Sequence, residues 1–221
     1  MYTYKHFCIS VAEFKRMDEK KPRKTDRRAL YTQKIIKENF MRILESGKRL
    51  EKITVSELCR LSEINRCTFY LHFSDIYGIL RELQKEVQES MIEFVNASLA
   101  DEKERRNLSA ILFASIRENH IFRVLSRYDL ISPVMRRVCD YSKRLLSELC
   151  VKTKQLTRRE AELFALFLVN GCAAVSEDQI INHWDSFKKD DVFTNKILDC
   201  LYSMIDFKAI GNALREKQIK E

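Results

Sequence analysis

The sequence predicts an all-α fold, and three observations support this prediction. Its 221 residues include only four glycines and two prolines, which is little turn chemistry for an all-β architecture. One third of the residues are charged, and the helix-favouring residues Leu, Lys, Glu and Arg are abundant. Apolar residues recur at helical spacing, and with 45% apolar content a packed core can form. We therefore expect the chain to be almost entirely helical.

The first expected helix follows a basic segment, KKPRKTDRR, at residues 20–28. Pro22 resists helix formation, so residues 1–24 are expected to form a flexible basic extension that either contacts DNA or stays solvated. Asp26 can cap the helix that follows, and Gly47 can end it. Four apolar residues share one face of this helix: Ile36, Phe40, Ile43 and Leu44.

Two short helices are expected next, within ITVSELCRLSEINRCTFYLHF at residues 53–73. Thr54 and Glu57 form a capping-box pattern that opens the first of them. Its predicted inner face carries Val55, Leu58 and Leu61. Asn65 is the expected N-cap of the second helix, with Ile64 and Phe69 placed as a hydrophobic staple around it.

Longer helices are expected after this pair. The first runs from its cap, Ser74, to about Asn96, and its apolar face carries Ile79, Leu83, Val87, Met91 and Phe94. Further helical segments are expected around residues 108–117, from Pro133 behind Ser132 to Cys150, and from Thr157 onward.

The helix that follows Thr157 has an unusual distribution of apolar residues. Thr157 and Glu160 form a second capping box, and residues 161–175 are apolar on nearly all sides. A helix of this kind needs cover on more than one side. A last helix is expected at about residues 191–205, with one stripe made of Phe193, Ile197, Leu201 and Met204.

The basic charge is concentrated in the first third of the chain. Residues 1–75 contain 17 Lys and Arg against 10 Asp and Glu, whereas residues 76–221 contain 23 against 22. A small basic segment on a nearly neutral body is typical of a protein that binds nucleic acid or an anionic membrane, although ordinary solvated helices would also explain it.

Several classes of function lack any signal. The cysteines are Cys8, Cys59, Cys67, Cys139, Cys150, Cys172 and Cys200. They form no CxxC pair and are expected to be reduced and mostly buried. The four histidines show no zinc-binding spacing, and no enzyme motif appears, so we expect no metal, no cofactor and no catalytic residue. No signal peptide or membrane span is apparent, and a cytoplasmic protein is expected.

The second short helix is expected to present a recognition face. A helical wheel places Phe69 and Phe73 inward and Cys67 and Leu71 outward, with Thr68 and Tyr70 flanking them. A helix of this kind fits the major groove of DNA. The two helices together predict a helix-turn-helix unit.

The segment ITVSELCRLSEINRCTFYLHFSDIYGIL resembles the DNA-binding head of the TetR family of bacterial transcription regulators. The residues that fit this family's pattern are Ile53, Thr54, Leu58, Cys59, Ser62, Ile64, Thr68, Phe69, Tyr70, His72 and Phe73. The resemblance is strong over residues 29–80, and beyond them it extends to the helical layout only. It implies a three-helix head at residues 25–78, followed by a helical ligand-binding and dimerisation domain at residues 79–221.

The resemblance also implies roles for individual residues. Phosphate contacts are expected from Thr54, Tyr70 and His72, and base contacts from Asn65, Arg66, Cys67, Thr68 and Leu71. For Arg66 a contact to phosphate alone is nearly as well supported, and Tyr70 and His72 could instead complete the packing. Two residues depart from the family's pattern. Glu63 replaces the usual turn glycine and Ile76 replaces a lysine that binds phosphate.

The function implied by the resemblance is a ligand-responsive transcription regulator, most often a repressor. It would bind pseudo-palindromic double-stranded DNA as a homodimer, with the helix at residues 161–175 and the last helix forming a four-helix interface. The effector is expected to be a small molecule, and its binding residues are unknown. His120 and Trp184 could line its pocket, although a core role is favoured for both. The alternative is a helical adaptor of the same fold that senses a ligand and acts through a partner protein.

Overall fold

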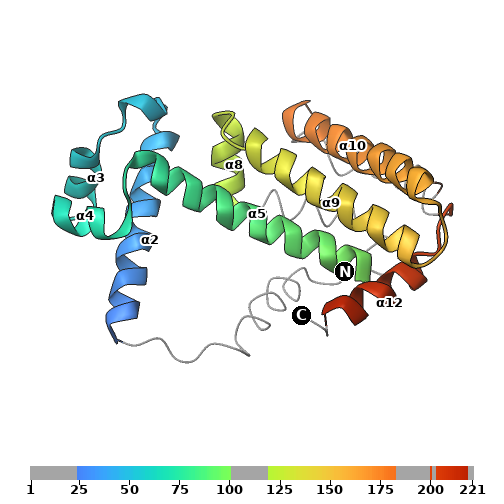
Figure 1. Ribbon diagram of the computed structural model, residues 1–221. Helices are drawn as coiled ribbons and strands as arrows, with labels where there is room; N and C mark the ends of the chain where they lie inside the picture. The colour runs from blue at the N-terminus through green and yellow to red at the C-terminus, as the bar shows by residue number, and fades with distance from the viewer. Residues whose placement is uncertain (1–23, 101–118, 183–199, 201–202, 219–221) are drawn as a thin grey trace, which may run out of the picture. The chain divides into compact units, whose positions relative to one another are not determined.

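The computed structural model describes residues 24–100, 119–182, 200 and 203–218, and within these ranges it is all-helical (Figure 1). This confirms the predicted fold class. The helices of the described residues are α2 (Lys24–Glu45), the 3-10 helix η1 (Leu50–Lys52), α3 (Val55–Leu61), α4 (Arg66–His72), α5 (Ile76–Ala100), α8 (His120–Arg127), α9 (Ser132–Lys152), α10 (Arg158–Asn182) and α12 (Phe207–Gln218). None of these helices combines the length and the apolar character that crossing a membrane requires.

The chain divides into two compact units, an N-terminal unit (Met1–Ile79) and a C-terminal unit (Leu80–Glu221). The boundary between them falls inside α5. The expected basic extension at residues 1–24 lies almost wholly outside the described residues, as do the helical segments expected at 108–117 and over most of 191–205.

Helix α2 forms much of the core of the N-terminal unit. Its apolar face is buried as predicted, at Ile36, Phe40, Ile43 and Leu44. The helix begins at Lys24, so Asp26 lies within its first turn and the prediction that Asp26 caps it is wrong. Gly47 follows the end of the helix with φ of 85°, and its N–H donates to the Leu44 carbonyl oxygen at 2.9 Å, as a helix-ending glycine does.

Helices α3 and α4 begin at the residues that the sequence predicts. Thr54 is the N-cap of α3, and Asn65 is the N-cap of α4. One predicted core residue is wrong: Leu61 is exposed, whereas Leu58 and Cys59 are the buried residues of α3. Leu61 is the last residue of α3, where the chain turns toward α4.

The long helix α5 begins one residue later than expected. Asp75, rather than Ser74, caps it, because Asp75 Oδ1 accepts a hydrogen bond of 2.6 Å from the Gly78 N–H. The helix continues to Ala100, beyond the expected end at Asn96. The expected apolar face is buried at Ile79, Leu83, Val87 and Phe94, and Met91 is half-buried.

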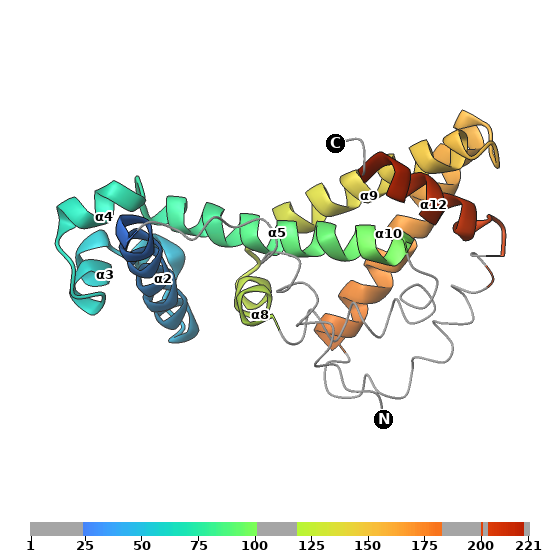
Figure 2. The same ribbon diagram turned by 90° about the horizontal axis from the view of Figure 1, so that it is seen from below.

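The C-terminal unit is built from α8, α9, α10, α12 and the greater part of α5. Helices α9 and α10 lie side by side (Figures 1 and 2), and α12 packs near the end of α5, where Gly211 faces the Ala100 and Leu99 carbonyl oxygens. The Gln84 side chain of α5 donates to the Leu130 carbonyl oxygen at 2.7 Å, and the Tyr141 hydroxyl of α9 donates to Asn96 Oδ1 at 2.8 Å. These two bonds connect α5 to α9 and to the turn before it.

The N-terminal ends of α9 and α10 can be compared with the caps that the sequence predicts. Ser132 is the first residue of α9 rather than its cap, so Pro133 lies one position later than predicted. The capping box at the start of α10 is complete, because the Thr157 N–H donates to Glu160 Oε2 at 2.8 Å and the Glu160 N–H donates to Thr157 Oγ1 at 3.4 Å. The hydrogen bonds from Thr157 lower the pKa of the Glu160 carboxyl.

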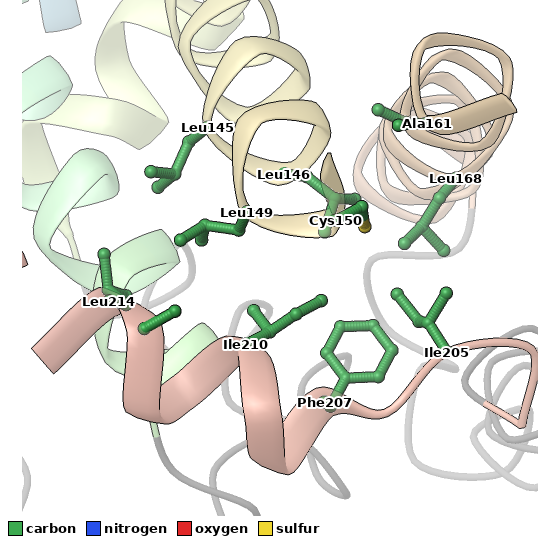
Figure 3. Packing of buried hydrophobic residues seen from close by; sticks show 12 residues of the cluster. Leu145, Leu146, Leu149, Cys150, Ala161, Leu168, Ile205, Phe207, Ile210 and Leu214 are labelled. Atoms are coloured by element: carbon green, nitrogen blue, oxygen red, sulfur yellow. The ribbon is translucent and has the colours of Figure 1, made fainter. Parts of the chain in front are cut away.

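Helix α12 completes the core of this unit, and the sequence prediction missed it. Figure 3 shows side chains of α12 meeting those of α9 and α10, with Phe207, Ile210 and Leu214 on the α12 side. The signal was available in the sequence, since Asp206 caps the helix by accepting from the Lys208 N–H at 2.9 Å. Gly211, in the middle of the segment, obscured the periodicity.

Candidate nucleic-acid interface

The outer face of α4 is exposed, and its inner face is buried. Phe69 is fully buried and Phe73 is nearly so, whereas Arg66 and Cys67 are exposed and Leu71 is 81% exposed. This is the division that the helical wheel predicts. The helix therefore presents an apolar strip with a guanidinium at its amino end.

The two N-cap side chains remain able to donate hydrogen bonds. Thr54 Oγ1 accepts from the Glu57 N–H at 3.2 Å, and Asn65 Oδ1 accepts from the Thr68 N–H at 2.7 Å. Capping uses an acceptor in both cases, which leaves the Thr54 O–H and the Asn65 NH₂ as donors. Both residues are exposed, so these donors are available to a phosphate or a base edge.

The remaining residues of the predicted site lie along the sides of α4. Tyr70 is 57% exposed while its ring meets the Phe69 ring edge-on, with the centroids 5.4 Å apart. Thr68 and His72 are half-buried. All eight predicted residues thus belong to α3, to α4 or to their caps, and six of them are exposed: Thr54, Asn65, Arg66, Cys67, Tyr70 and Leu71.

The turn between α3 and α4 is held by α2, which the sequence did not reveal. The Asn39 side-chain amide donates to the Leu61 carbonyl oxygen at 3.1 Å and to Ser62 Oγ at 3.0 Å. Asn39 and Ser62 are both buried. A buried polar cluster of this kind restricts where the turn can lie, because each unpaired group would cost free energy.

Glu63 in that turn adopts the left-handed conformation expected of the glycine it replaces. Its φ is 53°, a region in which an L residue with a side chain is strained. Nearby, Lys48 pairs with the Glu57 carboxylate at 2.6 Å and thereby ties the segment before α3 to its first turn. Because Glu57 is engaged by Lys48, only the Thr54 half of the predicted capping box is present among the described residues.

A hydrogen bond joins the two helices on the exposed side of the unit. The Arg66 guanidinium, at the start of α4, donates through Nη2 to Ser56 Oγ in the first turn of α3. Ser56 was not among the residues singled out from the sequence. A contact between side chains on separate helices has no signature in the spacing of residues along the chain.

Ile76 is part of the core rather than of the exposed surface. Only 8% of it is accessible, beside the buried Ile79 and Leu80 in the first turns of α5. The side chain at this position therefore contributes to packing.

Other candidate residues are placed less favourably for a site. His120 is exposed at the start of α8, so the expectation of a core role for it is wrong, and Trp184 lies outside the described residues. Cys67 is exposed, as the helical wheel predicts, whereas the exposure of Cys200 differs from the expectation of mostly buried cysteines; Cys8 lies outside the described residues. Within the described ranges, no three His, Cys, Asp or Glu side chains gather as metal ligands.

The chain resembles a known bacterial protein over part of its length. Over 114 residues, which is 50% of this chain, the sequence is 28% identical to YxbF, an uncharacterized HTH-type transcriptional regulator of Bacillus subtilis strain 168. The match spans 30% of the length of that protein. The chain matches no family model. The resemblance to the TetR family therefore rests on the motif residues themselves.

Proposed function

We propose that this chain is a DNA-binding transcription regulator that inserts α4 into the major groove. The observation that carries the proposal is the exposed outer face of α4, which is held on a buried core by two short, capped helices. Arg66, Cys67 and Leu71 on that face can meet base edges and thymine methyl groups. The name of the Bacillus relative, an HTH-type regulator, supports the same function.

The contacts to the DNA backbone come from hydrogen-bond donors around this face. Thr54, Tyr70 and His72 contact phosphates, whereas Asn65 and Thr68, in the first turn of α4 and its cap, contact base edges. The excess of basic residues in the first third of the chain supports duplex DNA as the partner, since phosphate contacts supply much of the binding free energy.

The regulator acts as a homodimer that recognises a pseudo-palindromic site. An exposed apolar stripe on α10 supports this, with Leu163, Leu166 and Phe167 at helical spacing. Phe167 is 68% exposed, which is costly for a side chain of that size in a monomer. If a second copy of the chain covered this stripe, the two α4 helices of the dimer could bind successive DNA half-sites, about one helical turn apart.

Ligand response and repression complete the proposal, and the TetR resemblance supports both. Helix α5 runs without interruption from the N-terminal unit into the C-terminal unit, so an effector bound in the second unit can act on the first through it. Operator and effector would then weaken each other's binding by one coupling free energy, typically about 1 to 3 kcal/mol.

The test is selection of DNA by the full chain from a duplex library with a random segment of about 25 base pairs, long enough for two half-sites. We expect a pseudo-palindromic consensus, bound more tightly than a scrambled duplex, with an affinity that falls steeply as salt rises. A chain that binds every duplex equally, or none, would contradict the proposal.

Ile76 and Glu63 favour a second candidate, a ligand-sensing adaptor of the same fold. Ile76 supplies no phosphate contact, and Glu63 adds a negative charge to the turn beside α4. The adaptor would bind a partner protein instead of DNA, so the selection experiment separates the two candidates.

A further inference from the structure

We infer that Ser56 is a positioning residue that holds the Arg66 guanidinium for base recognition. The inference rests on the proposed DNA-binding function and adds a residue of α3 to the determinants of specificity. It follows from the hydrogen bond between Arg66 Nη2 and Ser56 Oγ across the two helices.

The positions of the two residues suit this role. Ser56 lies in the first turn of α3 and Arg66 is the first residue of α4, and both are exposed. The charge of Arg66 also reaches the neighbouring Cys59 thiol, where it opposes the rise in pKa that burial causes. The guanidinium therefore lies back over α3 instead of extending freely into solvent.

Fixing the Arg66 side chain before DNA binds lowers the conformational entropy that is lost on binding. A free surface arginine loses rotamer freedom when it makes a bidentate contact to guanine, and that loss subtracts from affinity and from discrimination. Ser56 occupies one of the five guanidinium N–H donors and leaves the others for a base. With less freedom to reach a substitute acceptor, Arg66 discriminates more sharply against the wrong base pair.

The alternative is that Ser56 merely adds stability to the N-terminal unit. In that case its loss would weaken binding to every duplex equally, through a smaller folded fraction. A positioning role instead weakens discrimination at one base pair in each half-site, and only while Arg66 is present.

The experiment uses the full chain and the duplex that the wild-type protein selects from a random library. Binding of Ser56→Ala, Ser56→Thr, Arg66→Ala and the double variant Ser56→Ala/Arg66→Ala is measured on that duplex and on each of its single base-pair variants. Ser90→Ala, which removes an exposed hydroxyl from α5, is the matched control.

We expect Ser56→Ala to lower the discrimination between base pairs about threefold to tenfold, at the base pair where Arg66→Ala also loses it. This is the effect that the net contribution of one typical, solvent-exposed hydrogen bond predicts. Ser56→Thr keeps the hydroxyl and should keep the discrimination. The double variant should match Arg66→Ala, because Ser56 acts through Arg66.

Four results would overturn the inference. Additive losses in the double variant would mean that Ser56 acts independently of Arg66. Equal weakening on all duplexes, including a scrambled one, would assign Ser56 a structural or phosphate role. Unchanged discrimination in Ser56→Ala, with wild-type selectivity intact, would refute the positioning role while the proposed function stands, whereas absence of any selected sequence would refute both.

Discussion

Asn39 of α2 and Ser62 of the turn after α3 are joined by a buried hydrogen bond of 3.0 Å, from the amide Nδ2 to the hydroxyl oxygen. The same amide also donates a hydrogen bond to the Leu61 carbonyl oxygen, so Asn39→Ala leaves two acceptors without this donor. We expect it to lower the free energy of unfolding by about 1 to 3 kcal/mol, as measured in urea. Ser62→Ala removes only one acceptor and should cost less. An Asn39→Ala protein as stable as the wild type would contradict this account of the turn.

The left-handed conformation of Glu63 predicts that Glu63→Gly is more stable than the wild type. Glycine adopts a φ of 53° without a steric penalty, so the gain should be about 1 kcal/mol, less the entropy that glycine adds to the unfolded chain. Glu63→Ala is the control, since it removes the carboxylate but keeps the strain, and should bring no such gain. If alanine stabilises as much as glycine, the benefit comes from removing the charge.

Two helical glycines should respond in opposite ways to alanine. A Cβ on Gly211 would lie 3.0 Å from the Ala100 carbonyl oxygen and 3.1 Å from that of Leu99, so Gly211→Ala should lower stability by about 1 to 3 kcal/mol. Nothing lies within 4 Å of a Cβ on Gly171, where alanine should add about 0.5 to 1 kcal/mol. The midpoint temperatures of thermal unfolding of the two variants and the wild type, at the same protein concentration, test both expectations. If Gly211→Ala were more stable than the wild type, α12 would not pack as closely on the end of α5 as these distances indicate.

Because Cys67 is exposed, chemical labelling can test whether the outer face of α4 contacts DNA. The thiolate is the reactive form, and burial raises the pKa of Cys150 and of Cys172 to about 11, so both should alkylate slowly at about pH 8. Exposed Cys67 and Cys200 should react first with N-ethylmaleimide, as peptide mass spectrometry can show. The selected operator should protect Cys67 and leave Cys200 reactive. Equal labelling of Cys67 with and without operator would place α4 outside the groove.

The exposed stripe on α10 predicts self-association. Leu166→Glu and Phe167→Glu place a charge on the surface that a second copy would cover, so each should shift the protein from dimer to monomer in sedimentation velocity. Leu30→Glu places the same charge on an exposed leucine of α2 and should leave the dimer intact. A wild-type protein that sediments as a monomer at all concentrations would refute the dimer.

The sequence predicted those features of the fold that depend on neighbouring residues. The caps at Thr54, Asn65 and Thr157 and the helix end at Gly47 are local hydrogen-bonding events, and the structure contains each of them. Where two caps of similar quality were adjacent, as with Ser74 and Asp75, the sequence did not distinguish them.

What the sequence could not predict depends on contacts between distant residues. Leu61 is exposed at the end of α3, and the turn that follows it is anchored by Asn39, more than 20 residues earlier. The Ser56–Arg66 hydrogen bond could be predicted only if the relative placement of α3 and α4 were known. For the candidate site, the outward residues of α4 followed from periodicity alone, whereas the residues that support them did not.

The position of α12 along the chain also sets an order of events during translation. Contacts among α2, α3 and α4 lie within about 50 residues, so this part can fold soon after it leaves the ribosome. Gly211 meets the end of α5 only after more than 100 further residues have been made. Until then the apolar surfaces of α9 and α10 that α12 covers remain open to chaperones and to aggregation. We therefore expect slow synthesis between α10 and α12 to lengthen that exposure and to lower the yield of folded protein.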